Sequence, residues 1–368
     1  MKKLSFLLIV ALVLSLLAGC AGTPVIYYTE CDCPEGAHAG AQAPADQPQT
    51  DKPQTEAPVV SEGALKTGLY LSCGIGESKS ADAENNGEGK YDVTMVAVLV
   101  DDDGVIVDCI IDGVASSVKF DTAGTITSDL SSNPQTKNEL GENYGMVAWG
   151  GAIAEWDAQA AALASYAVGK TVEELKSGAI DETGKAPAGS DLASSATIYL
   201  GGYVAGIEAA VANAQHLGAQ AGDTLKMAAN CSVASSASAD AENAGNAQLD
   251  VDVAVVTMNG ETITSCVIDA VQAKVAFDAN GAITSDLSAP VQTKTQLGDN
   301  YGMVAWAGAI AEWYEQAASF SAYVTGKTAA EVAGIAVDEG TKPTDADLTA
   351  SVTIAIGGFQ ALIAKACQ

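Results

Sequence analysis

The sequence predicts an α+β fold built from two tandem copies of one antiparallel-sheet domain with helices packed on the sheet. The first observation is internal repetition: four strings occur twice, SADAEN at 80–85 and 238–243, ITSDL at 126–130 and 283–287, YGMVAW at 144–149 and 301–306, and GKT at 169–171 and 326–328. The offset between matching segments stays between 156 and 158 residues. This period is far longer than a solenoid unit, so we place the two copies at 64–218 and 219–368.

The second observation is β-branched patterning in the first part of each copy. Runs at 93–100 and 105–111 are separated by the turn-forming string DDDG at 101–104, and runs at 251–258 and 262–268 are separated by Asn259 and Gly260. Each pair predicts a hairpin. A further hairpin is expected at 118–127 with its turn at 121–124, and 278–281 predicts the same turn in the second copy.

The third observation is helical spacing in the second part of each copy. One apolar face is expected to hold Ile153, Trp156, Ala160, Leu163 and Ala167, and the matching face Ile310, Trp313, Ala317, Phe320 and Val324. The strings TVEE at 171–174 and TAAE at 328–331 are typical of a capping box that opens a helix. A last helix is expected at about 202–214, and again at 358–366. Strands followed by helices favour the α+β class.

The chain begins with features of an export signal. Lys2 and Lys3 precede an apolar run, and LAGC at 17–20 resembles the bacterial lipobox. The resemblance implies a signal peptide at 1–19, a diacylglycerol on Cys20, and an extracytoplasmic protein held at the membrane by that lipid. The apolar run is shorter than the roughly 20 residues of a spanning helix. Residues 20–63 are rich in Pro, Ala, Gln and Thr, which predicts a disordered spacer with a reach of about 35 to 40 Å.

Composition limits the partners. The chain has 17 basic and 46 acidic side chains and a net charge of −29, which argues against nucleic acid and against docking on anionic lipid. All basic residues are Lys, so the bidentate fork of Arg is absent. The two histidines, His38 and His216, are expected to be solvated linker residues, which makes histidine catalysis improbable. The DDDG string lacks the trailing Glu of a calcium loop and predicts a turn.

The segments before the two terminal helices, DLASSATIY at 191–199 and DLTASVTIA at 347–355, resemble the signature of the FMN-binding domain family. In that family an acidic residue precedes Ser-Gly-Ala-Thr, one further residue, and a Thr or Ser whose hydroxyl is esterified to the FMN phosphate. The resemblance implies hairpin strands first and the signature before a terminal helix. It also implies cofactor contacts at Ser194, Ala196 and Thr197, and at Thr353 in the second copy.

Departures from this signature bear on the cofactor. Ser195 replaces the glycine, and Tyr199 stands where the flavin-bearing hydroxyl would be. In the second copy Ser351 replaces the glycine and Ala355 has no hydroxyl. We therefore expect no covalent FMN, and the non-covalent binding of FMN stays an alternative.

The YGMVAW segments supply a second candidate site. Tyr144 and Trp149, and Tyr301 and Trp306 in the second copy, could present a flat aromatic platform to a ligand. Trp156 and Trp313, at helical spacing, are expected in the core.

Four cysteines match between the copies: Cys73 with Cys231, and Cys109 with Cys266. In an exported protein the pairs Cys73–Cys109 and Cys231–Cys266 are disulfide candidates, with buried free thiols as the alternative. The CDC string at 31–33 lies in the spacer.

These features favour a non-catalytic surface lipoprotein that binds a small molecule or an envelope protein. The alternatives are an extracytoplasmic electron-transfer accessory with non-covalent FMN, and a structural or adhesion module. No metal and no catalytic residue is expected.

Overall fold

The computed structural model describes residues 63–368, which belong to one compact unit. The predicted signal peptide, Cys20, His38 and the spacer up to residue 62 lie outside these residues. The secondary-structure composition confirms the α+β class. Within the described range the first half of the unit, to residue 218, comprises β1 (Lys66–Gly74), β2 (Gly87–Val100), β3 (Ile106–Phe120), α1 (Lys137–Leu140), η1 (Gly141–Tyr144), α2 (Met146–Gly150), α3 (Trp156–Ala167), α4 (Val172–Ala179), η2 (Leu192–Ser194) and α5 (Gly201–Ala212).

The second half, residues 219–368, follows almost the same order. Its elements are β4 (Thr224–Ser232), β5 (Gly245–Asn259), β6 (Thr262–Phe277), α6 (Lys294–Leu297), η3 (Gly298–Tyr301), α7 (Met303–Ala307), α8 (Trp313–Val324), α9 (Ala329–Ala333), α10 (Ala346–Thr349) and α11 (Gly357–Ala366). Each half contributes one three-stranded antiparallel sheet, in the orders β1-β2-β3 and β4-β5-β6. The hairpins predicted around DDDG and Asn259-Gly260 are confirmed, and their strands are longer than the β-branched runs.

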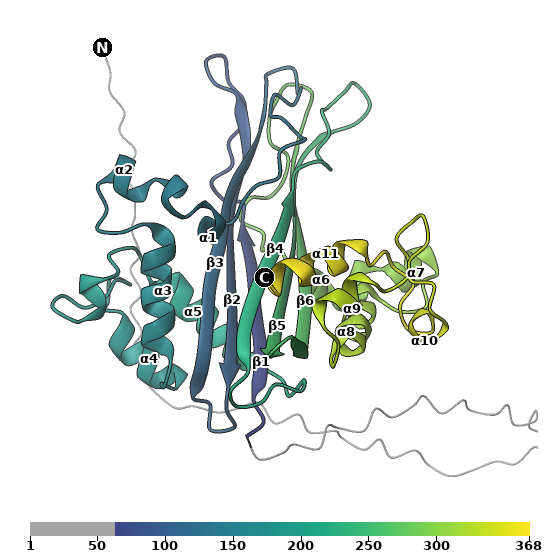
Figure 1. Cartoon of the computed structure of the whole chain (residues 1–368). Helices are drawn as coiled ribbons and strands as arrows, with labels where there is room; N and C mark the ends of the chain where they lie inside the picture. The colour runs from purple at the N-terminus through teal and green to yellow at the C-terminus, as the bar shows by residue number, and fades with distance from the viewer. Residues whose placement is uncertain (1–62) are drawn as a thin grey trace, which may run out of the picture. The chain divides into compact units, whose positions relative to one another are not determined.

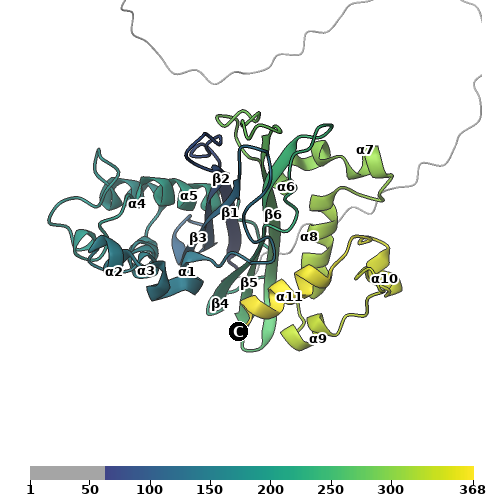
Figure 2. The ribbon, with the colours of Figure 1, turned by 90° about the horizontal axis from the view of Figure 1, so that it is seen from above.

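The sheets lie face to face at the centre, and each carries its helices on the opposite face (Figures 1 and 2). One core lies between the sheets and includes Leu71, Met95, Val253 and Val275. A second core packs β2 and β3 against α3, α4 and α5, and a third packs β5 and β6 against α8, α9 and α11. Other elements cover both faces of β2 and β5. The ends of these two strands are therefore continuous apolar runs, without the alternation of apolar and polar residues that a half-exposed strand has.

Reciprocal hydrogen bonds join the two halves near one end of the sheets. The Ile126 amide donates to the Ser238 hydroxyl, and the Ile283 amide donates to the Ser80 hydroxyl, both at 2.9 Å. Along their lengths, β1 lies beside β6 and β3 lies beside β4. We call these two places the β1–β6 seam and the β3–β4 seam.

The expected helices are largely confirmed. Thr171 and Thr328 each close a capping box with the Glu three residues later. Trp156 and Trp313 are only 3% and 5% exposed and pack in the helix-side cores. One expectation is wrong: Ile153 and Ile310 precede α3 and α8 and are exposed.

The second predicted hairpin is reduced to a tight turn. The Gly124 amide donates to the Asp121 carbonyl, and Phe120 forms an isolated bridge with Ile126. The matching bridge joins Phe277 and Ile283. Neither turn is followed by a further strand, so each sheet keeps three strands.

Candidate functional site

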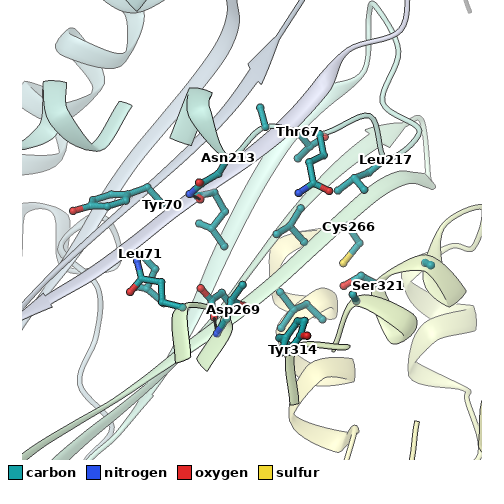
Figure 3. Close-up of a pocket in the computed structure, with 18 of the residues that line it drawn as sticks. Thr67, Tyr70, Leu71, Asn213, Leu217, Cys266, Asp269, Tyr314 and Ser321 are labelled. Atoms are coloured by element: carbon teal, nitrogen blue, oxygen red, sulfur yellow. Dashed lines mark hydrogen bonds between the residues drawn. The ribbon is translucent and has the colours of Figure 1, made fainter. Parts of the chain in front are cut away.

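A cavity of about 690 Å³ lies at the β1–β6 seam, a volume typical of pockets for small organic molecules. It is bounded by β1, the segment after α5, β6, α6 and α8 (Figure 3). Its walls are lined by Thr67, Leu69, Tyr70, Leu71, Ala212, Asn213, Ala214, Gln215, Leu217, Cys266, Val267, Ile268, Asp269, Thr295, Gln296, Tyr314, Ala318, Ser321, Ala322 and Thr325. Among the residues that the sequence singled out as candidate sites, Cys266 alone belongs to this lining.

The position of the cavity follows from the chain path. After α5 the chain turns back along the free edge of β1, where the Thr67 amide donates to the Gln215 carbonyl and the Gln215 amide donates to the Thr67 carbonyl. The Asn213 side-chain amide donates to the Leu69 carbonyl at 3.1 Å. These bonds hold residues 213–217 against the edge strand and form one wall.

Polar groups are placed within an otherwise apolar lining. The hydroxyl oxygen of Ser321, a residue only 5% exposed, is buried. It lies near the Cys266 thiol (Figure 3). Burial raises the pKa of Cys266 to about 12, an effect that the neighbouring Ser321 opposes. The Ser321 hydroxyl and the Cys266 thiol therefore form a polar pair in this wall of the cavity.

The electrostatics of the cavity disfavour anions. Asp269 is the only lining residue with a charged side chain of the Asp, Glu, Lys or Arg type. Its carboxylate accepts hydrogen bonds from the backbone amides of Ala270 at 2.8 Å and Thr295 at 3.1 Å. Burial raises the pKa of Asp269, and hydrogen bonds from Thr293 and other groups oppose that rise. A neutral or cationic ligand therefore fits this lining better than a phosphate.

The residues of the FMN-binding signature lie elsewhere, in the turns before α5 and α11. The side-chain oxygen of the buried Gln159 accepts from the Thr197 amide at 2.8 Å and from the Thr197 hydroxyl at 3.3 Å. Gln316 makes the same two bonds to Thr353, at 2.8 and 3.2 Å. Both threonines are thus engaged in holding a turn onto the preceding long helix.

The other signature residues also have structural partners. The Ser194 hydroxyl donates to the Asp191 carbonyl at 2.6 Å, and Ala196 is buried. Tyr199 is 60% exposed, and its ring covers Gly184 and Gly201.

The aromatic residues of each YGMVAW segment have contrasting surroundings. Trp149 and Trp306 are both 90% exposed, whereas Tyr144 and Tyr301 pack against the helix-side cores. The Lys137 ammonium lies 5.7 Å from the Tyr144 ring centroid, and that of Lys294 lies 5.4 Å from the Tyr301 centroid. The tyrosines therefore belong to interior cation–π clusters, and the tryptophans project outward.

Carboxylates hold the exposed tryptophan segments in place. Glu155 accepts from the amides of Met146 at 2.7 Å and Val147 at 2.9 Å, and Glu312 repeats this with Met303 and Val304 at 2.8 and 2.9 Å. We call residues 144–155 and 301–312 the tryptophan knuckles.

The disulfide prediction is wrong, because the four matched cysteines are free and buried. Cys73 and Cys231 face the core between the sheets, whereas Cys109 and Cys266 face the helix-side cores. On β2, Cys73 pairs with Val93 and Cys109 with Val98. Val93 and Val98 are five residues apart, and an odd separation places side chains on opposite faces of a sheet.

The prediction for His216 is also wrong. Its Nε2 lies 2.9 Å from an Asp102 carboxylate oxygen, and its side chain is mostly buried. Asp102 also pairs with Lys66 at 2.8 Å. His216 is therefore hydrogen-bonded to the Lys66–Asp102 ion pair at the DDDG turn, which the sequence did not indicate.

Two searches of the described residues find nothing. Between residues 63 and 368, no group of three or more His, Cys, Asp or Glu side chains could hold a metal ion. In the same range no helix has both the length and the hydropathy that crossing a membrane requires.

Comparison of the chain with protein-family models, with curated proteins and with solved structures finds no match in any of the three.

Proposed function

We propose that this protein is a non-catalytic, lipid-anchored binding protein of the cell envelope that takes a small molecule into the β1–β6 cavity. The observation that carries the proposal is the cavity itself: about 690 Å³, mostly apolar, and with a few polar lining residues that include Ser321 and Asp269. The lipobox-like LAGC string supports the membrane anchor on Cys20 and the extracytoplasmic location. Under this proposal residues 20–63 are a spacer between the lipid and the binding unit.

We also propose that the two halves descend from one FMN-binding-like domain by tandem duplication, at 64–218 and 219–368. The recurring strings support this, as does the matching order of strands, capping boxes and terminal helices. The signature turns then survive for their bonds to Gln159 and Gln316. The departures at Tyr199 and Ala355, and the lack of lysine in the cavity lining, favour a ligand other than FMN.

The ligand proposal is tested by mass spectrometry of small molecules extracted from protein purified from its own host. Val267→Trp fills the cavity, because Val267 lines it. Ile110→Trp is the matched control, since Ile110 occupies the corresponding position on β3 beside the other seam. We expect one compound to be lost in V267W and kept in the parent and in I110W. Identical extracts from all three proteins would contradict the proposal, and a visible flavin spectrum would favour the electron-transfer alternative.

The anchor proposal is tested separately with Cys20→Ala. We expect labelled fatty acid to enter the parent protein only, and the variant to accumulate as unprocessed precursor. Equal labelling of both proteins would refute the lipid anchor without affecting the cavity.

A second candidate function, docking of an envelope protein, is favoured by the tryptophan knuckles. Trp149 and Trp306 are equally exposed, and their segments are held by Glu155 and Glu312, so little conformational freedom would be lost on binding. Exposed Trp is a frequent hot spot of interfaces. A photo-cross-linker at Val147 should give an adduct in intact cells that Trp149→Ala abolishes. The same cross-linker at exposed Val107 is the control, and equal adducts at both positions would contradict docking at the knuckle.

A further inference from the structure

The two seams of the molecule place different side chains at corresponding positions. Leu71 and Ala229 are each the sixth residue of a nine-residue strand at a seam, β1 and β4. Gln296 and Glu139 are each the third residue of a capping-box helix, α6 and α1. Ala209 and Lys365 are each the ninth residue of a terminal helix, α5 and α11.

In the β3–β4 seam, Lys365 extends from α11 and contacts both β4 and α1. The Lys365 ammonium donates to the Ala229 carbonyl at 2.6 Å and forms an ion pair with Glu139. Its four-carbon stem runs from α11 to the edge of β4. In the β3–β4 seam, a strand carbonyl and a capping-box side chain therefore bind an alkylammonium group together.

In the β1–β6 seam the corresponding lysine is missing, and the cavity lies there. Ala209 has no side chain beyond Cβ, and Gln296 replaces the carboxylate of Glu139. Along the edge of β1 the carbonyls of Thr67 and Leu69 accept bonds from the segment after α5. Carbonyls two residues apart in a strand point to the same side, so the Leu71 carbonyl faces the same wall, where Leu71 lines the cavity.

The remaining polar groups suit a cation. The Gln296 side-chain oxygen accepts one hydrogen bond, from the Thr293 amide at 3.0 Å, and a carbonyl-type oxygen has a second lone pair. Asp269 adds a negative charge to the lining, and no ion pair involves it among the described residues. The net charge of −29 further raises the local concentration of cations.

From this comparison, and resting on the proposed binding function, we propose that the ligand of the β1–β6 cavity carries a primary alkylammonium group. The ammonium binds the Leu71 carbonyl and the Gln296 side-chain oxygen, in the place that the Lys365 ammonium takes in the other seam. The apolar part of the ligand contacts Leu69 and Val267. The group is supplied by a free aliphatic amine or by a lysine side chain of a peptide.

The inference is tested by calorimetry with three probes of equal length: pentylammonium, 1-pentanol and pentanoate. We expect pentylammonium to bind at least ten-fold more tightly than 1-pentanol, and pentanoate to bind most weakly. Nα-acetyl-lysine-N-methylamide is the second amine probe. The tighter of the two amines identifies the source of the group.

Two variants test the position of the ammonium. Gln296→Glu supplies the carboxylate that Glu139 provides in the other seam. This variant should bind pentylammonium several-fold more tightly than the parent protein does, with unchanged affinity for 1-pentanol. Ala209→Lys should abolish binding of both amines, because the new side chain occupies the site as Lys365 does. Ala205→Lys adds the same charge one turn earlier on α5, at an exposed position, and should leave binding intact. Equal thermal midpoints of A209K and A205K would show that both are folded.

The outcomes separate this inference from the proposed function. If 1-pentanol binds as tightly as the amines, and Q296E does not discriminate them, the alkylammonium inference is overturned and the cavity remains a binding site. Failure of all four probes also overturns it, and the extracts of V267W then decide whether the cavity binds any native compound.

Discussion

The rings of Phe120 and Phe277 stack between the two sheets, with centroids 3.8 Å apart and planes 3° from parallel. Both side chains are fully buried, and each ends the last strand of its sheet. The space beside them is limited: a Cβ at Gly87 or Gly245 would lie 2.2 Å from the ring of Phe120 or Phe277, respectively. This pair therefore joins the halves into one core.

We predict that Phe120→Ala or Phe277→Ala lowers the free energy of unfolding by about 3 to 5 kcal/mol. The double variant should lose less than the sum of the two single losses, by about 0.5 to 1.5 kcal/mol, because the stacking contact is counted twice in that sum. Urea unfolding measures all three variants. Val107→Ala, at an exposed position of β3, is the control and should change stability by less than about 0.5 kcal/mol. Full additivity would mean that the rings stabilise the halves independently.

The buried cysteines should be unreactive in the folded protein. Burial raises the pKa of Cys73, Cys109, Cys231 and Cys266 to about 12, so almost no thiolate is present at pH 8. Iodoacetamide should label these four only after unfolding, whereas the half-buried Cys367 should be labelled faster. A mass showing Cys73 joined to Cys109 would contradict the prediction.

The same thiols predict how stability depends on pH. An unfolded thiol ionises near pH 9 and these folded thiols near pH 12, so the unfolded state loses its protons first. The stabilising effect of the neutral thiols is complete below pH 9 and is lost as the pH rises toward 12. Denaturant titrations at pH 8, 9 and 10 should show a falling free energy of unfolding. Cys73→Ser, with a hydroxyl that does not ionise in this range, should weaken that fall.

Gln159 and Gln316 should matter more to stability than the threonines that they contact. Gln159→Leu removes the acceptor of the Thr197 and Ile198 amides and should be destabilising by about 1 to 3 kcal/mol. Thr197→Val removes only the 3.3 Å hydroxyl bond and should have an effect below about 1 kcal/mol. Thermal unfolding measures both variants. A larger loss in T197V than in Q159L would show that the hydroxyl holds the turn.

Neither half should carry covalent FMN, even when a flavin transferase is co-expressed. A phosphoester needs an aliphatic hydroxyl where Tyr199 has a phenol and Ala355 has a methyl group. A denaturing gel should show no fluorescence at the position of the protein, and a fluorescent band would overturn this. The double variant S195G/Y199T tests descent from the family, because flavin gained by that protein would support the resemblance.

Local patterns in the sequence were sufficient where the interaction is local. The capping boxes at Thr171 and Thr328, the DDDG turn and the long hairpins depend on residues a few positions apart, and they are confirmed. Trp156 and Trp313 were correctly expected in the core because helical periodicity reports a buried face. The strands β1 and β4 were not assigned from the sequence. Their short mixed segments, KTGLYLSCG and TLKMAANCS, form strands by pairing with β2 and β5.

The cysteines show that export of a protein does not by itself imply disulfide bonds. The sequence left two disulfides and four buried thiols as alternatives, because pairing requires side chains on one face at matched register. The register of β1 and β3 on β2 sends Cys73 and Cys109 to different cores.

The α+β class, the hairpins, the capping boxes and the internal repetition follow from the amino-acid sequence, because each depends on neighbouring residues or on direct comparison of strings. Three features emerge from the folded arrangement alone: the sheets share a core, Ser321 and Asp269 line a cavity with Leu71, and Lys365 occupies the β3–β4 seam. Residues about 200 positions apart, such as Leu71 and Asp269, meet there. Their meeting depends on the packing of β1 beside β6, an interaction that no periodicity or motif in either segment encodes.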